Sequence, residues 1–196
     1  YSTTKELKKF CESSTGGTII ANIPDSVYGL KQFIENGSHI IDTLRYLIGD
    51  FELLEKSIRF NTSKTDIDSI SAICKNRQWS ILINAHSLIP SNFYITVNSG
   101  KNVGELRPLE QFNLYEGIKV IEPTIDEPIR KYIPNLKYKF VEESKLKPGF
   151  ESMYKNFKLF ANKEYCESST IEDAVSTLKI LWKLINSDIA NNYLFK

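Results

Sequence analysis

The chain has 196 residues, 41% of them hydrophobic, and a formal net charge of +1. This length and apolar content fit one folded domain with a substantial core, and the near-zero charge excludes an electrostatic footprint for nucleic acid or an anionic membrane. No apolar run approaches the roughly 20 residues of a membrane span. The cysteines Cys11, Cys74 and Cys166 are widely spaced and predict free or buried thiols in a reducing compartment, the cytosol by default.

The first quarter of the chain predicts a helix, a turn and a strand. Leu7, Phe10 and Cys11 have helical spacing and predict a helix over residues 3–13. A glycine turn then leads to a strand over 18–23, which we expect to stop at Pro24. Residues 22–33 are predicted to form a loop that leads into the next helix.

The next helix carries the residues of greatest chemical interest. Its apolar stripe includes Ile40, Leu44 and Leu47, and the helix is expected to end at Gly49. Glu35, His39 and Asp42 stand at i, i+4 and i+7, which a helix places together on the other side. Two carboxylates and an imidazole gathered in this way either carry out proton chemistry or only make the helix soluble.

After Gly49 the apolar period changes from 3.6 to 2, which predicts strands. We expect six of them: 52–60, 67–75, 79–86, 93–99, 103–109 and 113–121. Their short connections favour antiparallel neighbours, including a hairpin turn over 89–92 between the third and fourth. Residues 122–148 hold several prolines and many charges, and we interpret them as a long irregular connection.

Two further helices are predicted at the end of the chain. An apolar stripe that includes Phe150, Met153, Phe157 and Phe160 has helical spacing, and such a stripe usually belongs to a core. The last helix is expected to start at a capping box formed by Ser169 and Glu172. Its inward-facing residues are expected to be Ile171, Ala174, Val175, Leu178, Leu181, Ile185 and Ile189.

These elements predict an α+β fold: a largely antiparallel open sheet of about six strands with helices packed on one face. The other face must be solvated or covered by a partner. Because Leu82 lies opposite Trp79, Ile81 and Ile83 in an alternating strand, we expect apolar residues on both sides of the sheet. This predicts a homo-oligomer that associates through the open sheet face.

Residues 35–49 resemble the signature of the Gfo/Idh/MocA oxidoreductases, in which an acid-x-Gly-x-His-x-x-Asp run opens a helix that closes with Leu-x-Gly. The order of elements, the stretch over 104–110 and the opening of the last helix continue the resemblance. A complete family member begins with a dinucleotide-binding domain that ends near a catalytic Glu-Lys-Pro motif. Neither a G-x-G-x-x-G run nor that motif occurs here. The resemblance therefore implies that residues 1–196 form a single carboxyl-terminal domain for substrate binding and catalysis, without the amino-terminal Rossmann domain.

The resemblance also implies a site. His39 takes the place of the family's catalytic histidine, and Glu35 that of the earlier acid, which is commonly Asp in the family. Candidate substrate-binding residues are Asn22, Tyr28, Lys31 and Asn36, and Asp42 is expected to give structural support. His86 is interpreted as a polar residue at a strand end. No Cys or His stands at ligand spacing, so no metal site is expected.

By the same resemblance, the intact protein transfers a hydride between NAD or NADP and a hydroxyl or carbonyl carbon of a sugar or nucleotide sugar. The missing domain would hold most of the cofactor, so we expect no cofactor in this chain and no turnover by it alone. Two alternatives stay open. The chain could be a stand-alone carbohydrate-binding, oligomerisation or scaffold domain. It could also be an unrelated interaction domain in which Glu35, His39 and Asp42 are ordinary surface residues.

Overall fold

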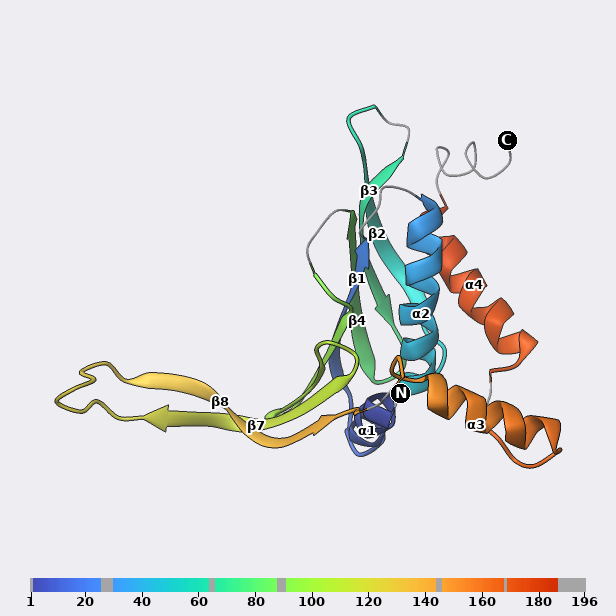
Figure 1. Cartoon of the computed structure of the whole chain (residues 1–196). Coiled ribbons are helices and arrows are strands. Elements are labelled where there is room, and N and C mark those ends of the chain that lie inside the picture. The colour runs from blue at the N-terminus through green and yellow to red at the C-terminus, as the bar shows by residue number, and fades with distance from the viewer. Residues whose placement is uncertain are drawn as a thin grey trace.

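The computed structural model describes residues 2–25, 30–63, 66–87, 91–143, 146–167 and 169–186, which fold around one eight-stranded sheet (Figure 1). The elements in chain order are α1 (Ser2–Glu12), β1 (Gly17–Asp25), α2 (Leu30–Ile48), β2 (Glu52–Phe60), β3 (Ile67–Lys75), β4 (Trp79–Ser87), β5 (Tyr94–Ser99), β6 (Asn102–Leu106), β7 (Gln111–Ile121), β8 (Lys131–Val141), α3 (Phe150–Ala161) and α4 (Ile171–Ile185). The predicted α+β class is confirmed, with eight strands instead of about six. None of the helices in the described ranges is long and apolar enough to cross a membrane.

The strand order is β2-β3-β4-β1-β5-β6-β7-β8, and every neighbouring pair is antiparallel except β1 and β4. The predicted hairpin between β4 and β5 is wrong, because β1 lies between them and pairs with both. The side chains of Ile19, Ala21 and Ile23 are fully buried, which explains why this strand occupies the centre of the sheet. β1 also continues past the expected stop, since Pro24 stands beside His86 in the parallel pairing.

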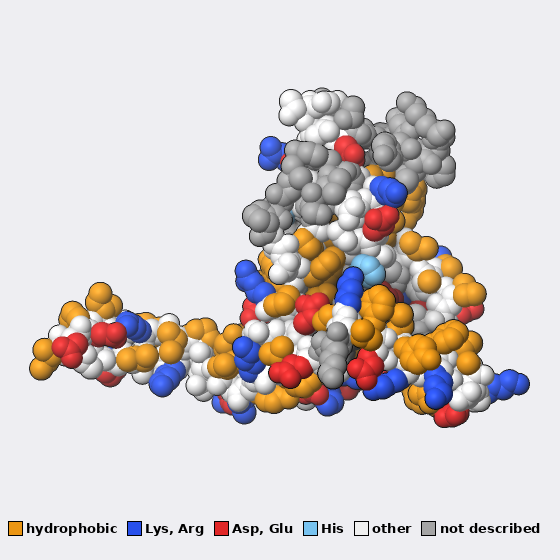
Figure 2. All heavy atoms as spheres, in the orientation of Figure 1, with side chains coloured by type: hydrophobic (Ala, Val, Ile, Leu, Met, Phe, Trp, Pro, Cys, Tyr) orange, Lys and Arg blue, Asp and Glu red, His pale blue; other side chains and the backbone are white. Residues whose placement is uncertain are grey.

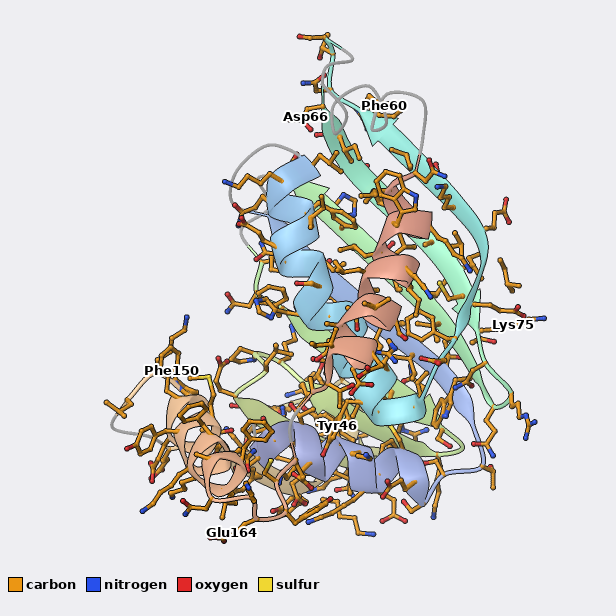
Figure 3. All side chains as sticks on the ribbon, turned by 90° about the vertical axis from the view of Figure 1, so that its right-hand side faces the viewer. Tyr46, Phe60, Asp66, Lys75, Phe150 and Glu164 are labelled. Carbon is orange, nitrogen blue, oxygen red and sulfur yellow. The ribbon has the colours of Figure 1, made fainter. Side chains whose placement is uncertain are left out.

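Helices α1, α2 and α4 cover one face of the sheet, as predicted (Figures 1 and 3). Trp79, Ile81 and Ile83 of β4 are buried in the core beneath them. The expected apolar residues on both sides of this strand are therefore present, because the helical layer covers these three and Leu82 lies on the other face. On the open face, Leu82 is paired with Ile73 of β3 and both are exposed.

Helix α2 begins at Leu30, earlier than the predicted loop allows. The Leu30 backbone N–H donates to Asp66 Oδ1 at 2.8 Å, so a side chain at the start of β3 satisfies the first turn of the helix. The helix ends before Gly49, whose φ of 79° fits the expected left-handed stop. Gly37 lets α4 approach closely, since a Cβ there would lie 2.9 Å from Leu181 Cδ1.

The last two helices differ from the prediction. Helix α3 has no buried residue, so its stripe is not part of the core: Phe150, Met153, Tyr154, Phe157 and Phe160 are all exposed. Helix α4 is capped one residue later than predicted, by a capping box of Thr170 and Asp173. Its buried residues are Thr177, Ile180, Leu181, Leu184 and Ile185. Of the residues predicted to face inward, Ile171, Ala174, Val175 and Leu178 are exposed, and Ile189 lies outside the described residues.

The prediction of an irregular segment over 122–148 is wrong for residues 131–141, which form β8. This strand pairs along β7 at the edge of the sheet, and nearly all of its residues are exposed. The hairpin projects well beyond the rest of the sheet (Figure 1). We call residues 116–136 the arm.

Candidate functional site

The signature residues lie on the outer surface of α2. Glu35 and His39 are exposed on consecutive turns, and Lys31 is exposed one turn before Glu35. Within the described part of the chain, the side chains of Glu35 and His39 make no hydrogen bond or ion pair; only their backbone carbonyls accept bonds, from Ser38 and Thr43. The imidazole and the carboxylate are thus both open to a ligand from outside the chain.

Asp42 points toward α4. Its Oδ1 accepts a hydrogen bond from Thr177 Oγ1 at 3.1 Å, and the same hydroxyl accepts one from Arg45 Nη1 at 3.0 Å. Arg45 Nη1 also donates to the Asp173 carbonyl at 2.7 Å, and its Nε to Asp50 Oδ1 at 2.8 Å. This cluster fixes α2 against α4. Support of the His39 ring by Asp42 stays a prediction.

Asn36 and Asn22 are placed differently from His39. Asn36 Nδ2 donates to the Pro24 carbonyl at 2.8 Å, which ties α2 to the end of β1. Asn22 lies between Ala21 and Ile23, whose side chains point into the core, so its own side chain is on the open face of the sheet. There it is buried and donates to Ser91 Oγ at 3.3 Å.

The structure therefore brings Glu35, His39, Lys31 and Asn36 together on one helix and separates Asn22 from them. His86 pairs with Pro24 on β1, and the alternation along β4 places its side chain on the same open face as Asn22. Tyr28 lies outside the described residues.

His39 is exposed, and two hollows formed by the described residues lie away from it. One hollow lies at the far end of α2, lined by Ile48, Asp50, Phe51, Glu52, Lys75, Asn76, Arg77 and Gln78. Another lies between the end of α1 and the turn from β5 to β6, with Phe10, Ser14, Gly100 and Lys137 among its lining residues. No group of His, Cys, Asp and Glu in the described ranges could hold a metal ion. A closed site at His39 thus needs a second surface, contributed by atoms other than those of the described residues.

Sequence reasoning missed the contacts that position α2 and α4. Asp66 caps α2, Arg45 joins it to α4, and Lys56 Nζ donates to the carbonyls of Lys183 at 2.7 Å and Asn186 at 2.6 Å at the end of α4. Burial lowers the pKa of Lys56. The backbone N–H of Thr170, above all, lowers the pKa of Asp173. The contacts between different elements join residues that are far apart in the chain, so no local spacing of residues predicts them.

An exposed imidazole with a carboxylate one turn away has the chemistry to accept and return a proton.

The sequence matches no model of a protein family and no curated protein. Solved oxidoreductases of the Gfo/Idh/MocA family do share its fold, as the resemblance implied. A Clostridium difficile dehydrogenase (MviM) superposes with a TM-score of 0.68 at 16% identity, over 94% of this chain and 59% of that one. A super-repressor mutant of Gal80p from Saccharomyces cerevisiae gives 0.67 at 14% identity, over 97% and 63%. KijD10, a 3-ketoreductase from Actinomadura kijaniata in complex with NADP, gives 0.63 at 10% identity, over 92% and 56%.

These similarities establish the fold. They also show that the chain spans little more than half the length of the solved proteins it matches, from 55% to 63%.

Proposed function

We propose that this chain is the substrate-binding and proton-transferring part of an NAD(P)-dependent oxidoreductase that acts on a hydroxyl or carbonyl of a sugar or nucleotide sugar. The observation that carries the proposal is the open pair of His39 and Glu35 on α2, in a fold shared with a dehydrogenase and an NADP-bound ketoreductase. A nicotinamide bound mainly by a domain outside this chain would supply the hydride chemistry.

In the direction of oxidation, the substrate carbon gives up a hydride and its hydroxyl gives up a proton. In the proposal His39 takes that proton, and the support for this role is that its imidazole is exposed and its side chain makes no hydrogen bond or ion pair within the described part of the chain. Glu35 is one turn away and can accept a hydrogen bond from the ring or from a substrate hydroxyl. Lys31 and Asn36, with Tyr28, complete the proposed contacts. We leave Asn22 out, because it faces the other side of the sheet.

The apolar surface of α3 and α4 supports a second domain that closes the site. Phe150, Met153, Tyr154, Phe157 and Phe160 are exposed on α3, and Ile171 and Leu178 on α4. Hydrophobic side chains gather over α3 in Figure 2, and Figure 3 shows α2, α3 and α4 on one side of the sheet. A domain packed on this side would bury apolar surface and could close over His39.

The test compares two histidine variants in a protein that includes a dinucleotide-binding domain. His39→Asn should lower turnover by about 10²–10⁴ with unchanged stability, because a positioned acid or base contributes roughly that factor. His86→Asn is the matched control, since His86 lies on the opposite face, and it should leave turnover unchanged. Glu35→Gln should be milder than His39→Asn if Glu35 only orients the ring. Full turnover in His39→Asn would refute the catalytic role.

A second candidate is a non-enzymatic carbohydrate-binding, oligomerisation or scaffold domain. It is favoured by the shared fold of the Gal80p super-repressor mutant, whose name describes a repressor, and by the exposure of His39. The two candidates differ in one measurement. A full-length protein that binds sugars but transfers no hydride with NADH or NADPH would favour the scaffold.

Three further expectations accompany the proposal. Self-association through the open sheet face stays a prediction. The cysteines suit the cytosol, since within the described residues Cys11, Cys74 and Cys166 are not joined by disulfides. We also expect the purified chain to show no saturable binding of NADH, measured by fluorescence titration, because its sequence has no G-x-G-x-x-G run to bind the cofactor's phosphates.

A further inference from the structure

The hollow between the end of α1 and the turn from β5 to β6 combines apolar, hydroxyl and cationic groups. We call it the α1 hollow. Its volume of about 450 Å³ lies within the range of small-molecule sites. The described residues that line it come from α1, from the turns next to it and from the strands β5 to β8, so it is separate from the surface of α2 that carries His39.

The floor of the α1 hollow is apolar and is formed by the fold itself. It consists of Phe10 and Leu114, which both pack against the core. Gly104 of β6 pairs with Leu114, and a Cβ at Gly104 would lie 2.7 Å from Phe10 Cδ1, so the absence of a side chain there makes room for the Phe10 ring. Helix α1 lies beside the base of the β7–β8 hairpin (Figure 1), where Thr3 Oγ1 donates to the Leu109 carbonyl at 2.6 Å. The floor is therefore in place without a ligand.

The hydroxyl groups of the lining are acceptors for a ligand. Ser13 Oγ and Ser14 Oγ both donate to the Phe10 carbonyl, at 2.9 and 2.7 Å, and Ser99 Oγ donates to the Gly16 carbonyl at 2.7 Å. A hydroxyl that gives its one proton to the chain can only accept a hydrogen bond from a ligand. The carbonyl end of α1 adds negative potential beside Ser13 and Ser14. This part of the lining therefore suits the hydroxyl groups of a ligand and disfavours an anionic group.

The two lysines of the lining are donors. Lys101 Nζ lies 3.2 Å from Glu116 Oε1, and Lys137 Nζ bonds to Glu116 Oε2 at the first residue of the arm. The bonds from Lys137 and Lys101 lower the pKa of the Glu116 carboxyl. One carboxylate thus serves two ammonium groups, which leaves a net charge of about +1 and further N–H donors on each lysine. An anion with several oxygens can accept from both ammonium groups.

We propose that the α1 hollow binds a small anionic sugar, with its phosphate or carboxylate at Lys101 and Lys137 and its hydroxyl groups at the serines. The proposal is independent of the oxidoreductase activity and concerns a different part of the surface. The apolar C–H groups of a sugar ring suit the floor at Phe10, and its hydroxyl groups suit lining oxygens that only accept. A neutral sugar would give the ammonium groups no anionic partner, and free phosphate would leave the serines unused. The two parts joined in one molecule should therefore bind more tightly than either part alone.

Isothermal titration calorimetry on the purified chain tests the chemistry of the ligand with four probes: glucose 6-phosphate, glucuronate, glucose and inorganic phosphate. We expect at least one of the two anionic sugars to bind saturably with a Kd below about 1 mM, and glucose and phosphate to bind roughly tenfold more weakly. The tighter of the two anionic sugars identifies the preferred anion. Neither of them binding at about 10 mM would overturn the proposal. Glucose or phosphate binding as tightly as the anionic sugars would also overturn it.

Two lysines of β8 provide matched variants that locate the site. Lys137→Gln removes an ammonium group from the lining, whereas Lys139→Gln removes the same charge from a residue that pairs with Asn113 and is not among the described lining residues. We expect Lys137→Gln to raise the Kd about three- to tenfold and Lys139→Gln to change it less than about twofold. Equal weakening by the two variants would overturn the proposal, because the net charge of the chain and not the hollow would then be the cause.

Glu116→Gln gives a change in the opposite direction. It removes the carboxylate that competes for both ammonium groups, so the Kd should fall by about threefold or more. A higher Kd in this variant would contradict the placement of the anion at Lys101 and Lys137. Circular dichroism should show all variants folded. His39→Asn should leave the Kd unchanged, and a loss of binding in that variant would place the sugar on α2 and overturn the proposal.

Discussion

Thr177→Val tests the contact that joins the two long helices. Valine has nearly the shape of threonine, so the change removes the hydroxyl and leaves the packing of this buried residue intact. That hydroxyl donates to Asp42 at 3.1 Å and accepts from Arg45 at 3.0 Å, and both partners are charged. Hydrogen bonds to charged groups contribute about 1.5–3 kcal/mol, and Arg45 keeps its other partners. We expect a loss of about 1.5–3 kcal/mol in the free energy of unfolding.

The assay is urea unfolding followed by circular dichroism, with thermal unfolding beside it. For a domain of this size each kcal/mol shifts Tm by about 2–4 °C, so Tm should fall by about 3–12 °C. Thr177→Ser is the matched control, since it keeps the hydroxyl and loses one methyl group, worth about 0.8 kcal/mol. A Thr177→Val variant within about 0.5 kcal/mol of the wild type would show that the hydroxyl does not hold α2 to α4. A larger loss in Thr177→Ser would point to packing as the cause.

Two further predictions concern the turn before β1 and the buried thiols. Gly17→Ala should lower the free energy of unfolding by about 2 kcal/mol or more, because the new Cβ would lie 2.0 Å from the Asn98 carbonyl oxygen. Gly100→Ala has open space around its new Cβ and should lower that free energy by about 1 kcal/mol. Thermal unfolding measures both losses. Burial raises the pKa of Cys11 to about 12 and that of Cys74 to about 11. The stability that these protonated thiols contribute is therefore fully present below about pH 8.5, and it is lost as the pH rises through the two raised pKa values. A thiol reagent at pH 8 should modify Cys166 first, and equal rates for all three cysteines in the native chain would contradict this burial.

Local periodicity predicted the elements that pack one face on the core of this chain, because that packing gives their sequence a regular pattern of apolar and polar residues. Strands β2 and β3 were predicted with their observed bounds. Strand β8 was missed, because Pro134 and the lysines around it are typical of a connection, and an exposed strand has no buried face to produce a clear alternation. The central place of β1 depends on pairings with strands more than fifty residues later, which no local pattern encodes.

The candidate site, too, was predictable from the sequence only in part. Helical spacing placed Glu35 and His39 on one exposed face, as observed. Counting along β1 from Ile19 puts Asn22 on the open face, so its separation from His39 was predictable from the sequence. The exposed stripe of α3 was not: a periodic apolar stripe indicates that a surface becomes buried, but it does not say whether the covering atoms belong to the same chain.

The central position of β1 has a consequence for the order of folding. Its neighbours are β4 and β5, so the strand closest to the start of the chain cannot be paired on both edges until residue 99 has been made. The β2-β3-β4 meander needs only local contacts and can form first. Until β4 and β5 have been synthesised, the apolar side chains of β1 are therefore exposed or covered only by α1 and α2; these side chains are Ile19, Ala21 and Ile23. Insertion of β1 is thus the step that turns two separate groups of strands into one sheet.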